Sequence, residues 1–248
     1  MKVSFFEEFP SKENLDKIKL IDFETKLYIA AYSLNEFKEI KKQIKNKHVK
    51  EIIYWPLIEM KEGYWFTPFS KRKAIQRIFD ELDNKNIPTM IDLELPFTRN
   101  FTLFFTQAFN FFRNKKLIRD FIKNNKVYCC EYFPEGKLKD KYMEILGIHF
   151  SPEKYNNKLI KMFYSSMHAF KEEWLKEKFS EGVRMHEGKF LIGLGTIARG
   201  ILGFEPILSK EELKKDLEIA KECNIEEVII FRLGGLNREY VNVIKTLN

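Results

Sequence analysis

Short apolar stretches alternate with longer charged stretches from one end of this 248-residue chain to the other. The apolar stretches have the length of buried strands, and the charged ones have the spacing of amphipathic helices. Strands separated by helices pair in parallel, and eight such units in about 250 residues are typical of a closed barrel. The expected strands are Lys2–Glu7, Lys26–Tyr32, Glu51–Pro56, Pro88–Glu94, Lys126–Tyr132, Lys158–Ser165, Lys189–Thr196 and Glu227–Leu233. The sequence therefore predicts an α/β fold, a (β/α)8 TIM barrel, with residues 1–248 forming a single domain.

An open, doubly wound sheet is the alternative for the same alternation. A dinucleotide-binding sheet needs a glycine-rich turn after its first strand, but residues 5–10 read Phe-Phe-Glu-Glu-Phe-Pro here. This turn argues against a dinucleotide-binding first crossover.

The expected helices lie between the strands, and two begin with a serine followed three residues later by a glutamate, the pattern of a capping box. They are Ser11–Leu20, Ser33–Lys47, Ser70–Asn84, Asn100–Asn124, Asp140–Leu146, Met167–Phe179, Ser209–Cys223 and Asn237–Leu247. In the fourth of these, one helical face is expected to carry Phe101, Phe104, Phe105 and Phe112. Two further rings, Phe109 and Phe111, could form a second apolar stripe. Packing against the barrel is favoured for this stripe. A homodimer contact or a lid over an apolar ligand is the alternative.

Composition narrows the class of protein. The 43 basic and 36 acidic residues leave a net charge of +7, spread over stretches that resemble solvated helix faces, so a nucleic-acid partner is not expected. Abundant Lys and Glu with few Cys fits a thermophile. No apolar run reaches the ~18 residues that span a bilayer, and the acidic start of the chain does not resemble a signal peptide. A cytoplasmic protein is expected. Of its three cysteines, Cys129, Cys130 and Cys223, the two adjacent ones lie within an expected strand and are predicted to be buried, reduced thiols.

Two acids stand at the end of the fourth expected strand, within Pro88-Thr-Met-Ile-Asp-Leu-Glu-Leu-Pro96. Alternation puts Asp92 and Glu94 on one face of that strand, where burial of two carboxylates costs free energy. The active sites of barrel enzymes lie at this end of the strands. Repulsion between two such acids can hold one of them protonated, as a general acid for glycoside hydrolysis requires. Structural ion pairing is the competing interpretation.

Other strand ends supply candidate ligand-binding side chains. Aromatic residues such as Trp55 can stack on sugar rings, although aromatic residues also pack loops against a barrel rim. The predicted substrate-binding residues are Glu8, Tyr54, Trp55, Glu131, Tyr164 and Arg232. An enzyme that acts on a small molecule or an oligosaccharide is therefore favoured.

Two short motifs resemble signatures of family 18 glycoside hydrolases, the chitinase-like barrels. They are Asp92-Leu-Glu94 on the fourth strand and Met162-Phe-Tyr164 on the sixth. The resemblance implies that Glu94 is the general acid, that Asp92 orients a substrate acetamido group, and that Tyr164 helps to hold that group. The chain departs from the family pattern at residues 88–91, which lack its aspartates and glycine, and at Ser165, where the family has an acid.

Glycines after the seventh and eighth strands indicate a second possible chemistry. The predicted anion-binding positions are Gly193, Gly195, Gly234 and Gly235. Backbone N–H groups in such loops bind phosphate in many barrels, and Lys161 on the sixth strand could form a Schiff base. A phosphosugar lyase or isomerase is thus one alternative, and a barrel that binds a ligand or partner without catalysis is another. No cofactor and no metal are predicted, because no histidine has metal-ligand spacing.

Overall fold

Eight parallel strands, paired in chain order, form a closed barrel in the computed structural model, which describes residues 1–96, 102–133 and 136–247. The strands are β1 (Lys2–Glu7), β2 (Thr25–Ala31), β3 (Val49–Pro56), β4 (Thr89–Asp92), β5 (Val127–Tyr132), β6 (Lys158–Phe163), β7 (Phe190–Gly195) and β8 (Glu227–Phe231). Every expected strand is present within two residues of its predicted start. The predicted (β/α)8 barrel is confirmed.

Helical segments follow the strands throughout the described chain. The α-helices are α1 (Lys12–Asp16), α2 (Leu34–Gln43), α3 (Arg72–Leu82), α4 (Thr102–Thr106), α5 (Phe111–Asn124), α6 (Lys137–Leu146), α7 (Pro152–Tyr155), α8 (Glu172–His186), α9 (Lys210–Glu222) and α10 (Arg238–Leu247). The 3₁₀ helices are η1 (Lys17–Leu20), η2 (Met60–Glu62), η3 (Ala108–Asn110) and η4 (Leu233–Gly235). The capping box at Ser209 and Glu212 is present. Among the described helices, none combines the length and the apolar sequence that crossing a bilayer requires.

Helix α8 lies several residues later than predicted. Residues just after β6 form a turn, in which the Met167 N–H donates to the Tyr164 carbonyl at 2.9 Å. The helix then continues through Gly182 to His186. A Cβ atom at Gly182 would lie 2.4 Å from the Phe190 ring, so the glycine permits close helix–strand packing instead of ending the helix.

The expected helix over residues 100–124 is divided into α4, η3 and α5, which changes the direction of its phenylalanines. Phe104 and Phe111 pack against Phe69, with ring centroids 4.8 Å and 5.1 Å away. Phe105 and Phe112 are exposed instead. The expected common face is therefore wrong for Phe104, Phe105 and Phe112, because the helix is not continuous. Phe101 lies outside the described residues.

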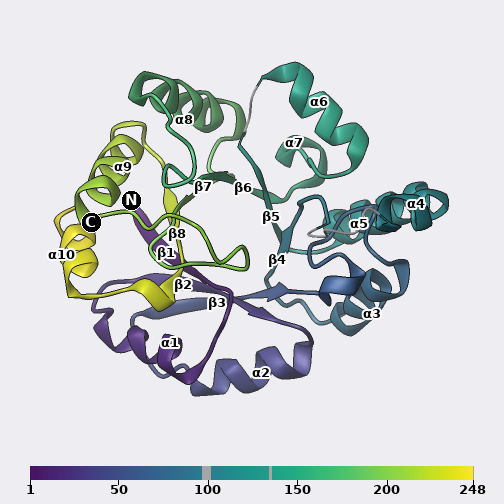
Figure 1. Cartoon of the computed structure of the whole chain (residues 1–248), viewed down its shortest axis with the longest axis horizontal. Helices are drawn as coiled ribbons and strands as arrows, with labels where there is room; N and C mark the ends of the chain where they lie inside the picture. Colours follow the sequence, from purple (N-terminus) through teal and green to yellow (C-terminus); the bar gives the residue numbers. More distant parts are fainter. Residues whose placement is uncertain (97–101, 134–135, 248) are drawn as a thin grey trace. The chain divides into compact units, whose positions relative to one another are not determined.

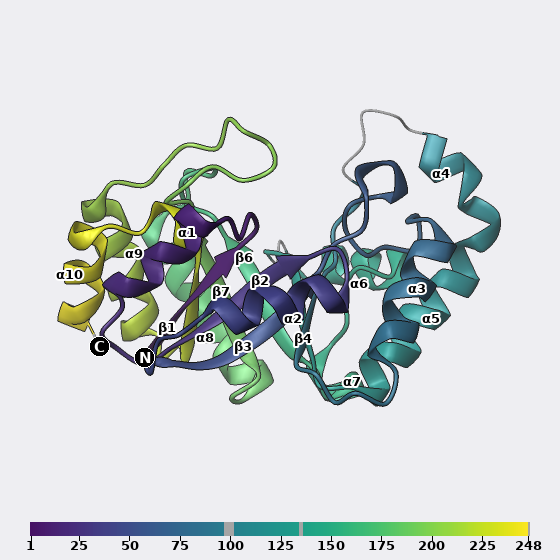
Figure 2. The same cartoon turned by 90° about the horizontal axis from the view of Figure 1, so that it is seen from below.

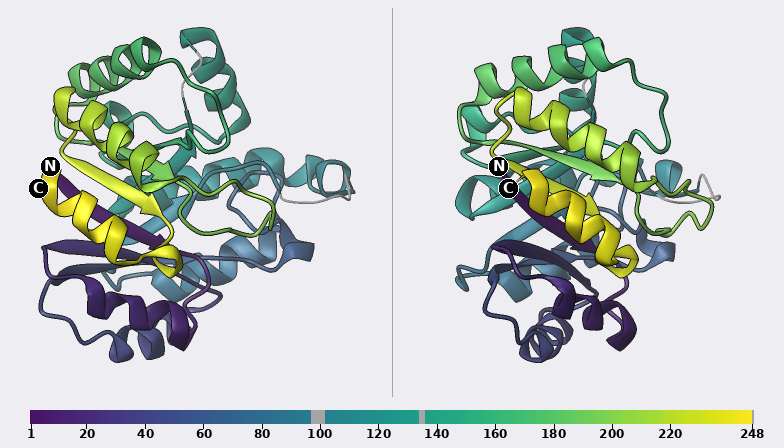
Figure 3. Two further views of the ribbon diagram at one scale, coloured as in Figure 1. Left: turned by 60° about the vertical axis from the view of Figure 1, so that its left-hand side comes forward. Right: turned by 90° about the vertical axis from the view of Figure 1, so that its left-hand side faces the viewer.

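The chain forms two compact units. The first contains residues 1–30, 39–53 and those from 161 onward. In it α9 and α10 lie side by side (Figure 1) and both cover the outer side of β8 (Figure 3). The buried Glu227 carboxylate accepts hydrogen bonds from Ser4, Lys26 and Tyr28, which ties β1, β2 and β8 together.

The second unit contains residues 31–38 and 54–160. Helices α3 and α5 run beside each other in it (Figure 2). Their contact includes Phe79 and Phe121, whose rings stack with centroids 4.0 Å apart. Phe66 stacks on the other side of this pair, 5.6 Å from Phe79, and so connects the loop after β3 to the helices.

Candidate functional site

The acids Asp92 and Glu94 lie at the carboxyl end of β4, in the second unit. The strand continues its hydrogen bonding beyond Asp92, because the Leu93 N–H donates to the Cys130 carbonyl at 2.8 Å. The Asp92 carbonyl accepts from the Phe66 N–H at 2.9 Å, which fixes the loop after β3 to this strand end. Asp92 is buried, with 4% of its surface exposed, whereas Glu94 is only partly buried.

The neighbouring strand β5 brings a thiol and a phenol to these acids. Asp92 and Cys130 are Cα partners in the β4–β5 pair, so residues two further on, Glu94 and Tyr132, continue along the same face. The Tyr132 phenol hydrogen-bonds the Glu94 carboxylate. Two carboxylates, one thiol and one phenol therefore gather at one strand end.

Burial keeps both β5 groups protonated. It raises the pKa of the Tyr132 phenol, and the negative charge of Glu94 raises it further. Burial also raises the pKa of the Cys130 thiol, with additional contributions from Asp92 and Glu94. A protonated phenol can donate to a carboxylate, whereas a protonated thiol is a poor nucleophile. Cys129 and Cys130 are free and buried, as expected, and Cys223 is free and buried as well.

Glu131 is also a predicted substrate-binding residue, but its side chain lies on the face of β5 opposite Cys130 and Tyr132. Its carboxylate accepts from the Phe150 N–H at 2.9 Å, and the second oxygen lies 2.7 Å from Nδ1 of His149. The side chain is 1% exposed. These contacts attach the segment before α7 to β5 and leave Glu131 apart from the group around Glu94.

Tyr54 and Trp55 at the end of β3 point to opposite sides because they are consecutive in a strand. Tyr54 stacks on Phe37 of α2, with ring centroids 4.8 Å apart, so it lies between strand and helix. Burial raises the pKa of its phenol. Trp55 is buried on the opposite face. Tyr64 and Phe66 of the following loop are fully buried and serve its packing.

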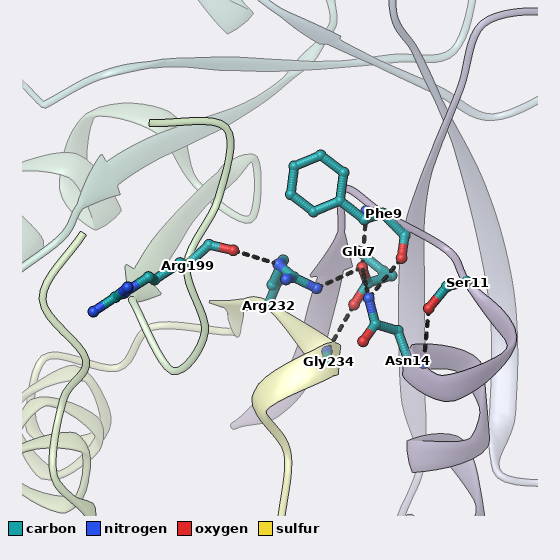
Figure 4. A network of polar contacts seen from close by, with 7 residues as sticks. All are labelled: Glu7, Phe9, Ser11, Asn14, Arg199, Arg232 and Gly234. Atoms are coloured by element: carbon teal, nitrogen blue, oxygen red, sulfur yellow. Dashed lines mark hydrogen bonds and ion pairs between the residues drawn. The ribbon is translucent and has the colours of Figure 1, made fainter. Parts of the chain in front are cut away.

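In the first unit, the predicted residues Arg232 and Gly234 meet around Glu7 (Figure 4). The Glu7 carboxylate accepts from the Arg232 guanidinium at 3.0 Å, from the Gly234 N–H at 2.7 Å and from Asn14 at 3.2 Å. Burial raises the pKa of Glu7, while Arg232 and the N–H donors act in the opposite direction. The loop after β8 thus binds an anion, and the anion is a side chain of the protein itself.

The other predicted positions of the first unit are packed closely. Gly193 is the least confined of them, because a Cβ atom there would lie at an ordinary contact distance of 3.5 Å from the rings of Phe6 and Tyr164. A Cβ atom at Gly235 would lie 1.8 Å from the Ile197 carbonyl oxygen, so this glycine allows two loops to touch. Glu8 is buried, and its Oε2 would lie 2.9 Å from a Cβ atom at Gly200. Gly195 is equally confined, with the Phe231 carbonyl oxygen 2.8 Å from its Cβ position.

The register of β6 separates Lys161 from Tyr164. Phe163 packs against Phe179 of α8, with centroids 4.9 Å apart, and therefore faces the helices. Lys161, two residues earlier, shares that face. Tyr164 faces the other way and contacts Phe231, 5.7 Å between centroids.

A partly buried polar pair that the sequence did not indicate links the segment after β6 to α9. The Ser165 hydroxyl donates to the Asp216 carboxylate. Burial raises the pKa of Asp216 to about 6, although the hydrogen bond acts in the opposite direction. A pocket of about 160 Å³ adjoins the pair, lined by His168, Phe170 and other residues.

Three contacts at these sites were missed from the sequence: those of Tyr132, Asn14 and His149. Residues two apart in a strand share a face, and Asp92 pairs with Cys130. The alternation that places Asp92 and Glu94 on one face of β4 therefore places Cys130 and Tyr132 beside them on β5. Nothing in the spacing of Asn14 or His149 indicates their partners. Among the described residues, no group of three or more His, Cys, Asp or Glu side chains is arranged to hold a metal ion.

No known protein family and no curated protein matches the sequence. Solved structures nevertheless share its fold. The glycoside hydrolase domain of PgaB (BpsB) from Bordetella bronchiseptica has a TM-score of 0.56 at 10% identity, over 97% of this chain and 95% of that one. A GH18 chitinase from Pseudoalteromonas aurantia has a TM-score of 0.58 at 9% identity, over 100% of both chains. The catalytic domain of a β-amylase from Paenibacillus polymyxa has a TM-score of 0.53 at 8% identity, over 99% of this chain and 97% of that one. At such identities the likeness shows the fold alone, a (β/α)8 barrel.

Proposed function

We propose that the protein is a glycoside hydrolase in which Glu94 is the general acid and Asp92 its partner carboxylate. The observation that carries the proposal is the group at the end of β4, where the Tyr132 phenol hydrogen-bonds Glu94 and Asp92 lies buried two residues earlier. The fold shared with glycoside hydrolase barrels supports a carbohydrate ligand.

The chemistry assigned to these groups is simple. Glu94 gives its proton to the glycosidic oxygen as the bond from that oxygen to the sugar carbon breaks. The negative charge of Asp92 stabilises the positive charge that develops on the sugar ring. Water then supplies the hydroxyl group that completes hydrolysis, and Glu94 recovers a proton from that water. In the chitinase-like version, Asp92 orients an acetamido group of the substrate that attacks the sugar carbon first.

The difference in exposure between the two acids supports this division of roles. A general acid must reach the leaving oxygen, and Glu94 is the partly exposed member of the pair. Asp92 is buried beneath it and is suited to act on charge or orientation. The Tyr132 phenol orients the Glu94 carboxylate and stabilises it when it is ionised.

The lyase or isomerase alternative has less support. A Schiff-base lysine must face the substrate, but Lys161 shares the helix-facing side of β6 with Phe163. A phosphate site needs free N–H donors, but the Gly234 N–H is bound to Glu7. Glu7 also pairs with Arg232, the nearest cation of the predicted anion site.

A substrate screen with matched variants tests the proposal. The wild-type protein, Glu94→Gln and Glu131→Gln are assayed on nitrophenyl and methylumbelliferyl glycosides, with and without an acetamido group. We expect wild-type turnover, a fall of about 10²–10⁴-fold in kcat/KM for Glu94→Gln, and a change of only a few-fold for Glu131→Gln. Equal activity of Glu94→Gln and the wild type would exclude Glu94 as the acid. Sugar binding without turnover by the wild type would favour the non-catalytic alternative.

A further inference from the structure

Two neighbouring helical segments of the second unit expose half of the large apolar side chains that the described surface carries. The described chain has twelve such side chains, and six of them lie in residues 102–124 and 136–147. They are Phe105, Phe109, Phe112, Leu138, Tyr142 and Ile145, which together we call the apolar face. The other six are distributed over the rest of the chain.

The phenylalanines of the apolar face are surface residues, because most of each side chain is exposed to solvent. Phe105, Phe109 and Phe112 are 76%, 94% and 81% exposed, and they are spaced by four and three residues. Phe104 and Phe111, their sequence neighbours, satisfy the packing against Phe69. Phenylalanines exposed to this extent bury little of their apolar surface within the chain, and a group of such side chains is typical of a surface that contacts something outside the chain.

Helix α6 carries the rest of the face with the same spacing. Leu138, Tyr142 and Ile145 are spaced by four and three residues, and all three are more than half exposed. The α6 helix is attached to α5 by Lys115, whose ammonium group donates to the carbonyls of Glu144 and Ile145 at 2.7 Å and 2.8 Å. The two parts of the face therefore belong to adjoining helices.

The same segments concentrate the positive charge of the chain. Residues 102–124 and 136–147 contain eight basic and three acidic residues, which accounts for five of the seven excess positive charges. Two of the three acids are in ion pairs, Asp120 with Arg119 and Glu144 with Lys154. Arg113, Lys116 and Lys141 are exposed.

We propose that the apolar face binds to the surface of an anionic lipid bilayer. Phenylalanine, leucine and isoleucine side chains enter the boundary between head groups and acyl chains, and the surrounding Lys and Arg residues attract acidic head groups. A second copy of the chain would bring the same positive charge against itself. Nucleic acid would satisfy the charge, but Leu138 and Ile145 cannot stack on bases as aromatic rings do.

Vesicle co-sedimentation of the full chain tests the proposal. The probes are vesicles of phosphatidylcholine alone and of phosphatidylcholine with phosphatidylglycerol. We expect binding to the anionic vesicles, weaker binding to the neutral ones, and a decline with added salt. Phe105→Ser/Phe109→Ser/Phe112→Ser and Arg113→Gln/Lys116→Gln/Lys141→Gln should each weaken binding by about tenfold or more. The matched control is Phe204→Ser/Ile207→Ser, which removes two similarly exposed apolar side chains from the first unit and should bind like the wild type.

Three results would overturn the proposal. The first is absence of binding to the anionic vesicles by a folded wild-type protein. The second is a dimer in analytical ultracentrifugation that the triple phenylalanine variant abolishes, which would identify a second copy of the chain as the occupant. The third is tight binding of an oligonucleotide that requires both sets of residues while vesicles do not bind. Unchanged circular dichroism and Tm of the variants ensure that a loss of binding is not a loss of folding.

Discussion

The Tyr132 phenol hydrogen-bonds the Glu94 carboxylate, and so the last residue of β5 holds the acid that lies two residues beyond β4. This contact exists because β4 and β5 pair in parallel with Asp92 opposite Cys130, which leaves both side chains on one face. Burial and the nearby carboxylates keep the phenol protonated at neutral pH, so it acts as a donor. Glu94 consequently has a fixed partner in a position where a general acid needs a fixed orientation.

Replacing this partner should alter the pH dependence of the reaction. In Tyr132→Phe the donor that stabilises ionised Glu94 is lost, so the protonated form persists to higher pH. We expect the basic limb of the kcat/KM profile to move to higher pH and the maximum to fall by about tenfold, the effect of one hydrogen bond to a charged group. Profiles of Tyr132→Phe and wild type on one substrate measure the shift. Parallel profiles that differ only in height would contradict a link between Tyr132 and the acid.

The thiol beside these acids should be unreactive in the folded protein. Burial and the charges of Asp92 and Glu94 raise the pKa of Cys130, which leaves little thiolate at neutral pH. Cys129 and Cys223 are buried as well. Titration with a thiol-specific chromogenic disulfide should therefore detect no fast-reacting thiol in buffer and all three in denaturant. A fast native signal that Cys130→Ala removes would show that reagent and solvent reach the end of β5.

The ion pair between Glu7 and Arg232 should contribute to the stability of the fold. Glu7 is fully buried, and Arg232 Nη1 lies 3.0 Å from its carboxylate. In Arg232→Ala the carboxylate keeps its N–H donors but loses its counter-charge, and we expect the free energy of unfolding to fall by about 3 kcal/mol. Urea unfolding measures this loss.

Arg199→Ala is the control for that experiment. Arg232 Nε donates to the backbone carbonyl of Arg199, a contact that the substitution retains, and the Arg199 side chain is exposed. We expect its stability to remain within about 0.5 kcal/mol of the wild type. The double variant Glu7→Gln/Arg232→Ala should recover part of the loss, because no buried charge remains. Equal losses in Arg232→Ala and Arg199→Ala would contradict the assignment.

The architecture could be predicted because strand and helix signals alternate without ambiguity, whereas the direction of side chains could not. Barrel strands are buried on both faces, so apolar residues occur at every position and do not reveal which face is inward. The predicted site accordingly included both Tyr54 and Trp55, although consecutive strand residues cannot share a face. Tyr54 lies against α2.

The partners of the charged residues are the second feature that could not be predicted from the sequence. A sequence identifies Glu131 and Arg232 as charged residues at strand ends, but it does not reveal that His149 and Glu7 are beside them. These partners come from distant segments, 18 and 225 residues away, and no local pattern encodes such pairings. The prediction of one continuous helix over residues 100–124 was wrong for a third reason. The helix is interrupted at η3, and this interruption exposes rings that a continuous helix would have buried.

The Ser165–Asp216 pair gives the protein a pH-dependent component of stability. The pKa of Asp216 is raised to about 6 in the folded protein from an ordinary value of 3.8, so the folded state holds this proton more tightly than the unfolded state. The resulting stability is present in full below about pH 4 and is lost as the pH rises through 6, with a total of about 3 kcal/mol.

The variant Asp216→Asn cannot lose a proton, so its stability lacks this dependence on pH. We therefore expect the free energy of unfolding of the wild type, relative to Asp216→Asn, to decrease between pH 4 and pH 7 in urea titrations. Ser165→Ala removes a donor that favours the charged carboxylate, so it should make the decrease steeper. A difference between wild type and Asp216→Asn that is constant with pH would mean that Asp216 titrates as an ordinary exposed acid.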